Sequence, residues 1–358
     1  MVMLKHKIRK ALEEHDLEAF LFVALDRRDR ESLRYLSGFQ GYGGVVIWSI
    51  EGCTLLLHPL EAPQAEHESF CEVVEAKEPL ETACQILKNV RRVGIDLAAI
   101  SAREYELITR ILPEGVLVAV PGFVPKLAIQ KDPWEQELLV KAAEVTCQVL
   151  RGLHSVVRKG MSEADLAAEI VHSIYMHGGD GTSFDTIVAF SENAYYPHHP
   201  PSRERKLRPK DLVLVDFGAS VRGYGADLTR VFSLGEPSPR FKDLYGIVWK
   251  AQEAALERVV AGVKAEEVDA AARHVFEQLG YHDYFTHGVG HGLGVGGLPR
   301  LEPGGEIVLA PGMVFTIEPG LYIPGLGGIR IEDDILLTKE GPTILTTGRT
   351  RELPVLEV

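Results

Sequence analysis

The chain has 358 residues, 46% of them hydrophobic and 25% charged, which is an ordinary globular composition with enough length for two hydrophobic cores. A formal net charge of −13 argues against nucleic acid as the main partner, because phosphate groups repel an acidic surface. No run of about 18 apolar residues could cross a membrane, and we expect no secretion signal because the N-terminus is charged throughout.

The first third of the sequence predicts a small α/β domain. We expect helices over 3–20, 79–90 and 101–112, where apolar residues recur with helical spacing. Short apolar runs bounded by Gly, Pro and Asp predict strands over 17–25, 43–50, 53–59 and 92–96. The proline-containing segment 118–137 closes this unit, so we place a first domain at residues 1–125.

The remainder, residues 126–358, predicts a second and larger α+β domain. Asp132 and Pro133 are typical of a helix start, and Ser162 of a second one, so we expect helices over 133–158 and 162–177. Further helices are expected over 239–262 and 265–280, and strands over 183–190, 211–219, 226–234, 284–298, 313–323 and 328–338. Helices followed by strands occur twice, which suggests an internal duplication.

The four cysteines are Cys53, Cys71, Cys84 and Cys147. They show no CxxC spacing, so we expect four free thiols in a reducing cytoplasm.

Two aspartates lie in the segment 212–235, which predicts a β-hairpin with a glycine-rich turn. A turn centred at 221–222 would make Asp216 and Asp227 cross-strand partners, with Cβ atoms about 4.5–5.5 Å apart. Asp216 follows the apolar run LVLV, and a buried carboxylate must be paired, protonated or bound to a metal. The alternative is that one aspartate faces solvent or pairs with Arg222 or Arg230.

Two glutamates lie in a second predicted hairpin, 313–338. Strand alternation places Glu318 on the face of Thr316, and Glu332 on the face of Arg330. This hairpin would also bring two acidic groups together. The alternative is a surface ion pair between Glu332 and Arg330.

Two histidines begin the stretch HGVGHGLGVGGLPRL at 287–301. The interspersed glycines argue against a helix, and on an extended chain His287 and His291 would lie about 13 Å apart. Both could not bind one ion, so one is a candidate ligand and the other a cleft residue, unless both are plain loop histidines. Four carboxylates and one imidazole suit two divalent ions in a hydrolytic site and are too poor in sulfur for a structural zinc site.

The same stretch matches the dinucleotide pattern GxGxxG at Gly292, Gly294 and Gly297. No helix can follow through LPRLEPGG, and dinucleotide binding requires that helix, so we exclude this interpretation.

Five motifs in order resemble those of the Xaa-Pro peptidases, prolidase and aminopeptidase P, of the pita-bread metallopeptidase group. They are VDFG, ADLTR, HGVGHGLG, TIEPG and IRIED, and the eleven-residue step between the aspartates also matches. YLSGF (35–39) and LAIQKDPWEQELL (127–139) resemble the family's N-terminal domain and its junction with the catalytic domain. The resemblance implies a creatinase-like α/β domain followed by an α+β pita-bread catalytic domain.

The resemblance also implies roles for site residues. Asp216 would bind one of two divalent ions, Asp227 and Glu332 would bridge them, and His291 and Glu318 would complete the second. Glu318 would also move the proton in catalysis. His198, in NAYYPHH, would contact the substrate, His287 would line the cleft, and Arg330 would support the substrate site.

One position departs from the family pattern. The family continues from the ligand histidine as GHGxGxxxH, whereas Leu298 stands seven residues after His291. A leucine can neither donate a hydrogen bond nor carry charge. Loss of one positioned donor typically costs about 10²–10³ in rate, unless His199 or His287 replaces it.

From these observations we expect a cytoplasmic enzyme that cleaves short peptides at Xaa-Pro bonds, with the dipeptidase type favoured over the aminopeptidase. The implied cofactor is two divalent ions, Mn or Co ahead of Zn or Fe, and the resemblance implies a homodimer. The alternatives are a creatinase-like hydrolase that works without metal and a non-catalytic binding protein of the same fold.

Overall fold

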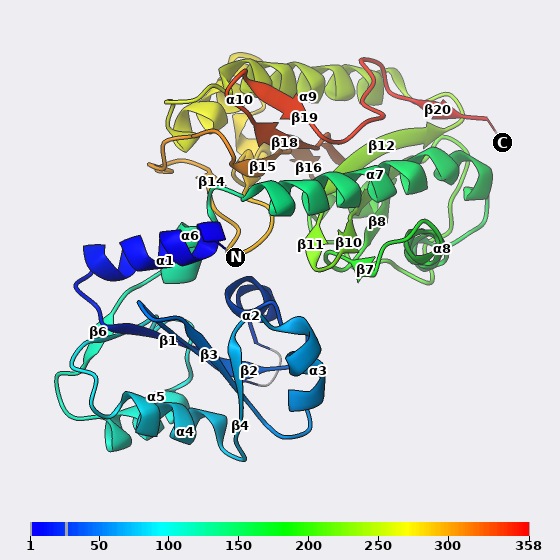
Figure 1. Ribbon diagram of the computed structural model, residues 1–358. Helices are drawn as coiled ribbons and strands as arrows, with labels where there is room; N and C mark the ends of the chain where they lie inside the picture. The colour runs from blue at the N-terminus through cyan, green and yellow to red at the C-terminus, as the bar shows by residue number, and fades with distance from the viewer. Residues whose placement is uncertain (1, 26–27, 358) are drawn as a thin grey trace. The chain divides into compact units, whose positions relative to one another are not determined.

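The structure, a computed structural model, describes residues 2–25 and 28–357. Its contacts divide the chain into two compact units, Met1–Ala128 and Ile129–Val358. Each unit has its own sheet structure and its own hydrophobic core (Figure 1).

The N-terminal unit is built on one mixed six-stranded sheet with the order β4-β3-β2-β1-β5-β6. β2 is antiparallel to both of its neighbours, β1 and β3. β4 is parallel to β3, β5 is parallel to β1, and β6 is parallel to β5. The strands are β1 (Ala19–Ala24), β2 (Gly44–Ser49), β3 (Cys53–Leu57), β4 (Glu72–Glu75), β5 (Val93–Ile95) and β6 (Leu117–Ala119).

The helices of this unit cover the two faces of the sheet (Figure 1). They are α1 (Val2–Glu14), α2 (Arg30–Ser37), α3 (Ala62–Glu68), α4 (Pro79–Leu87), α5 (Ala102–Ile111) and α6 (Phe123–Ala128). The helix expected over 3–20 ends at Glu14, because Asp16 takes a positive φ of 52° and the chain turns into β1. The sequence did not predict α2, α3, β4, β6 or α6, which are all short.

The expectation of four free thiols is wrong for two cysteines. Cys53 and Cys71 form a disulfide, with their Cα atoms 4.9 Å apart, whereas Cys84 and Cys147 are buried free thiols. Cys53 begins β3 and Cys71 immediately precedes β4, and these two strands are parallel neighbours. The pairing of the strands therefore brings the two thiols together, which the 18-residue separation does not reveal.

The C-terminal unit has two pairs of helices with strands between them, and Figure 1 shows α7 and α8 on one side and α9 and α10 on the other. The helices are α7 (Pro133–Val156), α8 (Glu163–Met176), α9 (Pro239–Arg258) and α10 (Ala265–Gln278), with two 3₁₀ turns, η1 (Ser191–Tyr195) and η2 (His282–Tyr284). The capping boxes at Asp132 and Ser162 start α7 and α8 where the sequence predicts them.

Strands of the first half form a four-stranded sheet, β20-β12-β9-β8, and a three-stranded one, β11-β10-β7. They are β7 (Gly181–Thr182), β8 (Ile187–Phe190), β9 (Leu212–Phe217), β10 (Ala219–Val221), β11 (Tyr224–Gly225) and β12 (Leu228–Leu234), joined by the C-terminal β20 (Val355–Leu356). Alternate residues of β9 enter different cores: Leu212 and Leu214 pack on the α9–α10 side, Val213 and Val215 on the α7–α8 side.

The second half supplies shorter strands, namely β13 (Gly290–His291), β14 (Arg300–Leu301), β15 (Val314–Ile317), β16 (Gly320–Ile323), β17 (Gly327–Arg330), β18 (Asp333–Leu337) and β19 (Pro342–Ile344). The strand expected over 284–298 is therefore wrong except at Gly290–His291. Gly294, Gly296 and Gly297 take positive φ values, and the chain loops there before it pairs back as β14.

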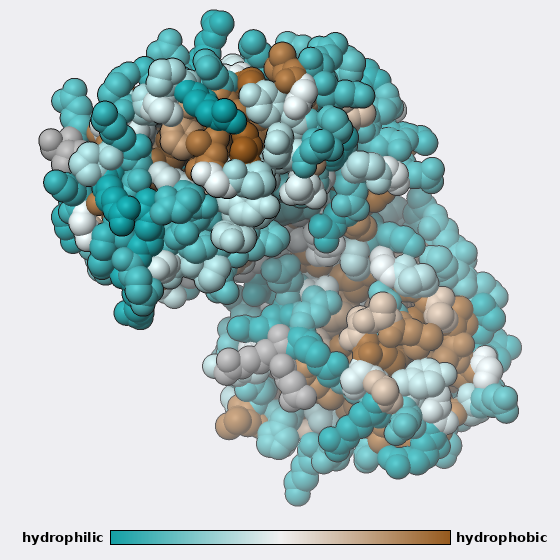
Figure 2. Space-filling model, turned by 180° about the vertical axis from the view of Figure 1, so that it is seen from behind, coloured by the Kyte–Doolittle hydropathy of each residue, from teal (hydrophilic) through white to brown (hydrophobic). Residues whose placement is uncertain are grey.

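No helix within the described ranges is long and apolar enough to span a membrane. Figure 2 shows apolar side chains in patches between polar ones on the rear face of both units. Such a surface is typical of folded globular proteins, most of whose accessible surface is apolar.

Candidate active site

Asp216 and Asp227 lie on the α9–α10 side of the sheet, but they are not directly opposite each other. The chain turns at Arg222 and Gly223, which both take positive φ. In the resulting register Asp216 pairs with Thr229, and Asp227 lies two residues before Thr229 on the same strand side. The expected turn at 221–222 was one residue too early, because a two-residue turn with positive φ at both positions matches the twist of the strands. Diagonal neighbours of this kind share one face of the sheet.

Glu318 and Glu332 oppose each other at an interruption of the second hairpin. β15 pairs with β18 and β16 with β17 in one common register, which aligns Glu318 with Glu332 between the two paired regions. Pro319 has no N–H to donate, so the ladder is interrupted there, and one hydrogen bond, from Ile331 N to Pro319 O at 3.3 Å, crosses the gap. The hairpin thus directs both carboxylates to the same place.

His291 reaches this place from β13. Its Nε2 lies 3.4 Å from Asp227 Oδ2 and 3.5 Å from Glu318 Oε1. Gly290, the residue before it, allows the backbone to lie against β15, because a Cβ there would come within 2.0 Å of Thr316 O. The structure therefore brings His291 to the predicted carboxylates.

The residues at this place fit divalent metal ions. One ligand atom each from Asp227, His291 and Glu332 lies within 4.8 Å of the others. Asp216 Oδ1 and Glu332 Oε1 are buried and have no hydrogen-bond partner among the residues that the structure describes. Buried carboxylate oxygens normally have a partner, and a cation would supply one.

The pKa values describe the same crowding of negative charge. Burial, together with the charges of Glu332 and Asp216, raises the pKa of Asp227 well above its usual range. Burial and the charges of Glu318 and Asp216 do the same to the pKa of Glu332. Burial lowers the pKa of His291, but Asp227 and Glu318 outweigh it and raise that pKa to about 9. A bound cation would relieve this repulsion.

Arg330 is buried and connects the carboxylates to His287. Its Nη2 donates to Asp216 Oδ2, its Nε donates to Thr229 Oγ1 at 2.9 Å, and its Nη1 donates to the hydroxyl of Tyr322 at 2.7 Å. The alternative of a surface pair between Arg330 and Glu332 is therefore wrong, because both residues are buried and Arg330 pairs with Asp216 and, at 4.0 Å, with Glu318. The alternative that one of the two aspartates faces solvent is also wrong, because both are buried. Asp216 pairs with Arg330, and Arg230 pairs with Asp333.

Both ring nitrogens of His287 are engaged. Nδ1 lies 2.7 Å from Gly288 O, which can only accept, so Nδ1 carries the proton and Nε2 accepts from the Tyr322 hydroxyl at 2.8 Å. Burial, assisted by the charge of Arg330, lowers the pKa of His287 to about 4, so the ring is neutral at neutral pH. His287 thus belongs to a directed chain of hydrogen bonds from Arg330 through Tyr322.

His198 and His199 have different surroundings although they are adjacent. His199 Nε2 lies 2.8 Å from Glu163 Oε2, with 13% of the His199 side chain exposed. His198 is exposed. His199 is therefore bound to Glu163.

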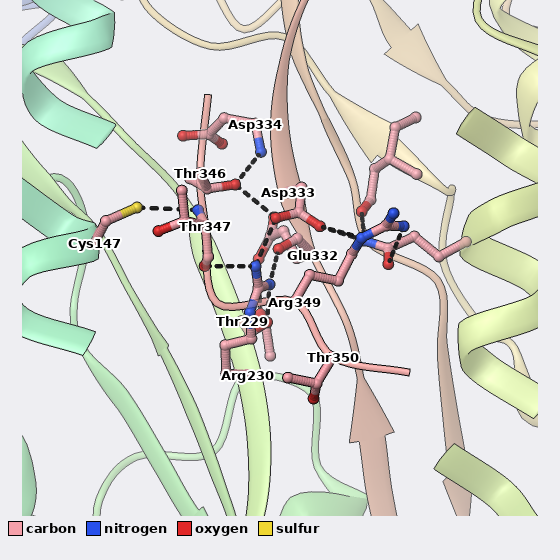
Figure 3. A network of polar contacts seen from close by, with 12 residues as sticks. Cys147, Thr229, Arg230, Glu332, Asp333, Asp334, Thr346, Thr347, Arg349 and Thr350 are labelled. Carbon is pink, nitrogen blue, oxygen red and sulfur yellow. Dashed lines mark hydrogen bonds and ion pairs between the residues drawn. The ribbon is translucent and has the colours of Figure 1, made fainter. Parts of the chain in front are cut away.

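A buried polar network lies behind Glu332 (Figure 3). The carboxylate of Asp333 accepts hydrogen bonds from Arg230 Nη2 at 2.6 Å, Thr346 Oγ1 at 2.7 Å and Gln252 Nε2 at 2.9 Å. Gln252 Nε2 also donates to Ile317 O at 3.3 Å, next to Glu318. This network therefore holds the chain at both hairpin glutamates.

The neighbouring carboxylate of Asp334 extends the network to the first hairpin, because its Oδ2 accepts from Asp227 N at 3.1 Å. Thr346, in the segment that follows β19, donates to Asp333 and accepts from Asp334 N at 3.1 Å (Figure 3). The C-terminal segment thus closes the rear of the site.

Sequence reasoning missed several residues that support the site, among them Thr229, Tyr322, Gln252 and Asp333. Two had a usable signal: Thr229 is two residues after Asp227, and Tyr322 is four residues after Glu318, so alternation places each on the ligand-bearing face. Gln252 had none, because only the packing of α9 brings it to the hairpin.

Comparison with known proteins covers nearly the whole chain. Residues 137–339 match the model of metallopeptidase family M24, and residues 5–127 match the creatinase/prolidase N-terminal domain. The chain belongs to metallopeptidase family M24. Its membership confirms the resemblance inferred from the five motifs and the expected fold, a pita-bread catalytic domain preceded by a smaller N-terminal domain.

Individual relatives of the family agree over the full length. The Xaa-Pro dipeptidase of Pyrococcus horikoshii is 32% identical over 352 residues, which cover 97% of this chain and 98% of the relative. The structure of an Xaa-Pro dipeptidase from Bacillus anthracis aligns with a TM-score of 0.92 at 31% identity, covering 99% of each chain. That of an X-Pro aminopeptidase from Thermotoga maritima aligns with a TM-score of 0.88 at 30% identity, covering 98% of this chain and 100% of that one.

Proposed function

We propose that the protein is a prolidase, a metal-dependent dipeptidase that hydrolyses the bond before proline in short peptides. The observation that carries the proposal is the convergence of Asp227, His291 and Glu332, with buried oxygens of Asp216 and Glu332 left without partners, in a chain of family M24. The relatives named as Xaa-Pro dipeptidases share about a third of the sequence over almost the whole length.

Five residues would hold two divalent cations: Asp216, Asp227, His291, Glu318 and Glu332. By the family resemblance Asp227 and Glu332 would hold both cations, and one oxygen of each lies within 4.8 Å of the other and of His291. When bound, the cations would lower the pKa of water and stabilise negative charge on the scissile carbonyl oxygen. We favour Mn or Co over Zn or Fe, since oxygen-rich ligand sets suit the harder ions.

The chain's own residues would handle the proton and the substrate. Glu318, whose pKa is raised by burial, would take a proton from the attacking water and deliver it to the proline nitrogen. His198, which is exposed and which the family resemblance places at the substrate, would donate to the substrate. Arg330 and Tyr322 would hold Asp216 and His287 in place.

Three further features belong to this proposal. The domain boundary would lie at residues 125/126, the enzyme would be cytoplasmic, and it would act as a homodimer. The second candidate is an Xaa-Pro aminopeptidase, which the alignment with the Thermotoga maritima enzyme favours.

The first test measures metal content and turnover together. The protein loaded with Mn or Co should bind about two ions per chain and cleave Xaa-Pro dipeptides faster than Xaa-Pro-Yaa tripeptides, and a chelator should abolish turnover. Asp227→Ala and Glu318→Ala should lose activity, whereas Glu340→Ala, which removes an exposed carboxylate outside the site, should not. A folded chain that binds no metal would refute the proposal, turnover that survives the chelator would indicate a creatinase-like hydrolase, and bound metal without turnover a binding protein.

Leu298 provides the second test. The side chain is half-buried in the loop between β13 and β14. If the absent histidine limits the native enzyme, Leu298→His should raise kcat/KM for Xaa-Pro dipeptides by up to about 10²-fold. An unchanged or lower rate would show that the native chain does not depend on a donor at this position.

A further inference from the structure

Glu163 is a buried carboxylate that the proposed chemistry does not use. It is the first residue of α8 and is completely buried. A fully buried carboxylate is rare unless it is paired or fully hydrogen-bonded. Its partners therefore indicate what the residue does.

Among the described residues, every hydrogen bond of the Glu163 carboxylate goes to a single segment, residues 190–202. Its Oε1 accepts from Phe190 N at 2.7 Å and from Asn193 Nδ2 at 2.9 Å. Its Oε2 accepts from Ser202 N at 2.9 Å and lies 2.8 Å from His199 Nε2. One carboxylate thus binds the start, the middle and the end of the loop that carries His198.

The loop is also supported from its other side by β17. Gly328 allows that strand to lie against η1, because a Cβ at Gly328 would come within 2.1 Å of Ala194 O. β17 ends at Arg330, which is bound to Asp216. The loop is therefore held between the start of α8 and the strand that leads into the metal-binding cluster.

We infer that Glu163 is the positioning residue for His198, and that its carboxylate fixes the loop so that the exposed ring of His198 faces the substrate. His199 serves this arrangement as a donor to Glu163. The inference rests on the proposed function, because it assigns His198 a contact with the substrate. A misplacement of about 1 Å in a catalytic site can cost about 10²-fold in rate, so the anchor should affect catalysis without touching the substrate.

The test is a double-mutant cycle on the metal-loaded full-length enzyme with Glu163→Gln, His198→Ala and the double variant. The amide of glutamine would point a donor at groups that donate, so the loop should lose its fixed position. We expect Glu163→Gln to lower kcat/KM for an Xaa-Pro dipeptide by about 10- to 100-fold in the native background and by less than about 3-fold in the His198→Ala background. An equal fold-loss in both backgrounds would overturn the inference, because a general structural defect does not depend on His198.

Matched variants keep this test interpretable. Glu104→Gln replaces another buried carboxylate in the first turn of a helix, in the N-terminal unit, and should act equally in both backgrounds. Asn193→Ala removes a single donor to Glu163 and should give a smaller loss that also disappears in the His198→Ala background, even if Glu163→Gln does not fold.

A second readout does not require turnover. In spectra of protein labelled at histidine Cε1, assigned with His198→Ala, we expect Glu163→Gln or Asn193→Ala to shift or broaden the His198 signal and to leave that of His287 in place, with metal content unchanged. An unaltered His198 signal in a folded variant would overturn the inference. Absence of Xaa-Pro turnover in the native enzyme would instead refute the proposed function and leave this readout to decide on Glu163.

Discussion

At the scale of single residues, Glu332 and Asp333 show how neighbouring carboxylates acquire different tasks. Asp333 points to the rear and is satisfied by three donors. Glu332 points to the opposite face, where Thr229 Oγ1 donates to one oxygen at 2.7 Å and the other oxygen has no partner within residues 2–25 and 28–357. Strand alternation alone separates a structural carboxylate from one that is available to a cation.

His287 gives a prediction of pH dependence. Its pKa in the folded protein is lowered to about 4, mainly by burial, whereas an unfolded histidine titrates near about 6.5. Between about pH 6.5 and pH 4 the imidazole of residue 287 is protonated in the unfolded chain but not in the folded one. The contribution of His287 to the free energy of unfolding is therefore complete above about pH 6.5 and is lost as the pH falls toward 4. The free energy of unfolding should therefore fall less steeply between pH 7 and pH 4.5 in His287→Gln than in the native protein.

Denaturant titrations in the presence of a chelator measure this slope without a contribution from metal release. His274→Gln, which replaces an exposed histidine of α10, should retain the native slope. Parallel curves for the native protein and His287→Gln would contradict the assignment of a neutral, buried ring.

At the scale of elements, α9 fixes the hairpin that carries Glu318 and Glu332. Ile317 and Asp333 are paired residues of β15 and β18, next to the two glutamates. Among the described residues, Gln252 is the one residue of α9 that donates hydrogen bonds to this pair. Gln252→Leu would leave Ile317 O and Asp333 Oδ2 without this donor, so it should lower the free energy of unfolding by about 1–3 kcal/mol and weaken metal binding.

Urea denaturation and metal titration check both effects. Gln278→Leu removes an exposed amide from α10 and should change stability by less than about 0.5 kcal/mol. A Gln252→Leu protein with native stability and native metal affinity would show that the hairpin holds its shape without α9.

At the scale of the whole molecule, the two units are stabilised by different means. The N-terminal unit contains the Cys53–Cys71 disulfide, whereas the candidate metal ligands all belong to the C-terminal unit. A disulfide that closes a loop of this size contributes about 3 kcal/mol. Cys53→Ala/Cys71→Ala should therefore destabilise the N-terminal unit by about this amount, and metal should not restore the loss there.

Hydrogen exchange followed by mass spectrometry on the full chain can localise the effect. Faster exchange is expected within residues 28–128, and a reductant should have no additional effect on the variant. Cys84→Ala serves as the control, because this buried cysteine is a free thiol. Faster exchange spread evenly over both units would contradict the prediction.

The sequence predicted the long, periodic and capped elements well, such as α7 and α8. It also named Asp227, His291 and Glu332, which the fold brings together. It could not supply what depends on tertiary pairing. The register of Asp216 against Thr229 depended on a turn shifted by one residue, and the Cys53–Cys71 bond required β3 and β4 to become neighbours. Glu163 carried no motif of its own, because its role exists only once the 190–202 loop folds back onto α8.

The common register on both sides of the interruption at Pro319 has a consequence for tolerance to insertion. Pairs of β15 with β18 fix the hairpin below Glu318 and Glu332, and pairs of β16 with β17 fix it above. The tip, at Pro324 and Gly325, is exposed and contributes to neither set. A tag or reporter peptide inserted there would therefore leave Glu318 and Glu332 opposite each other. One extra residue beside Pro319 or Ile331 would instead shift the strand register and separate the two glutamates.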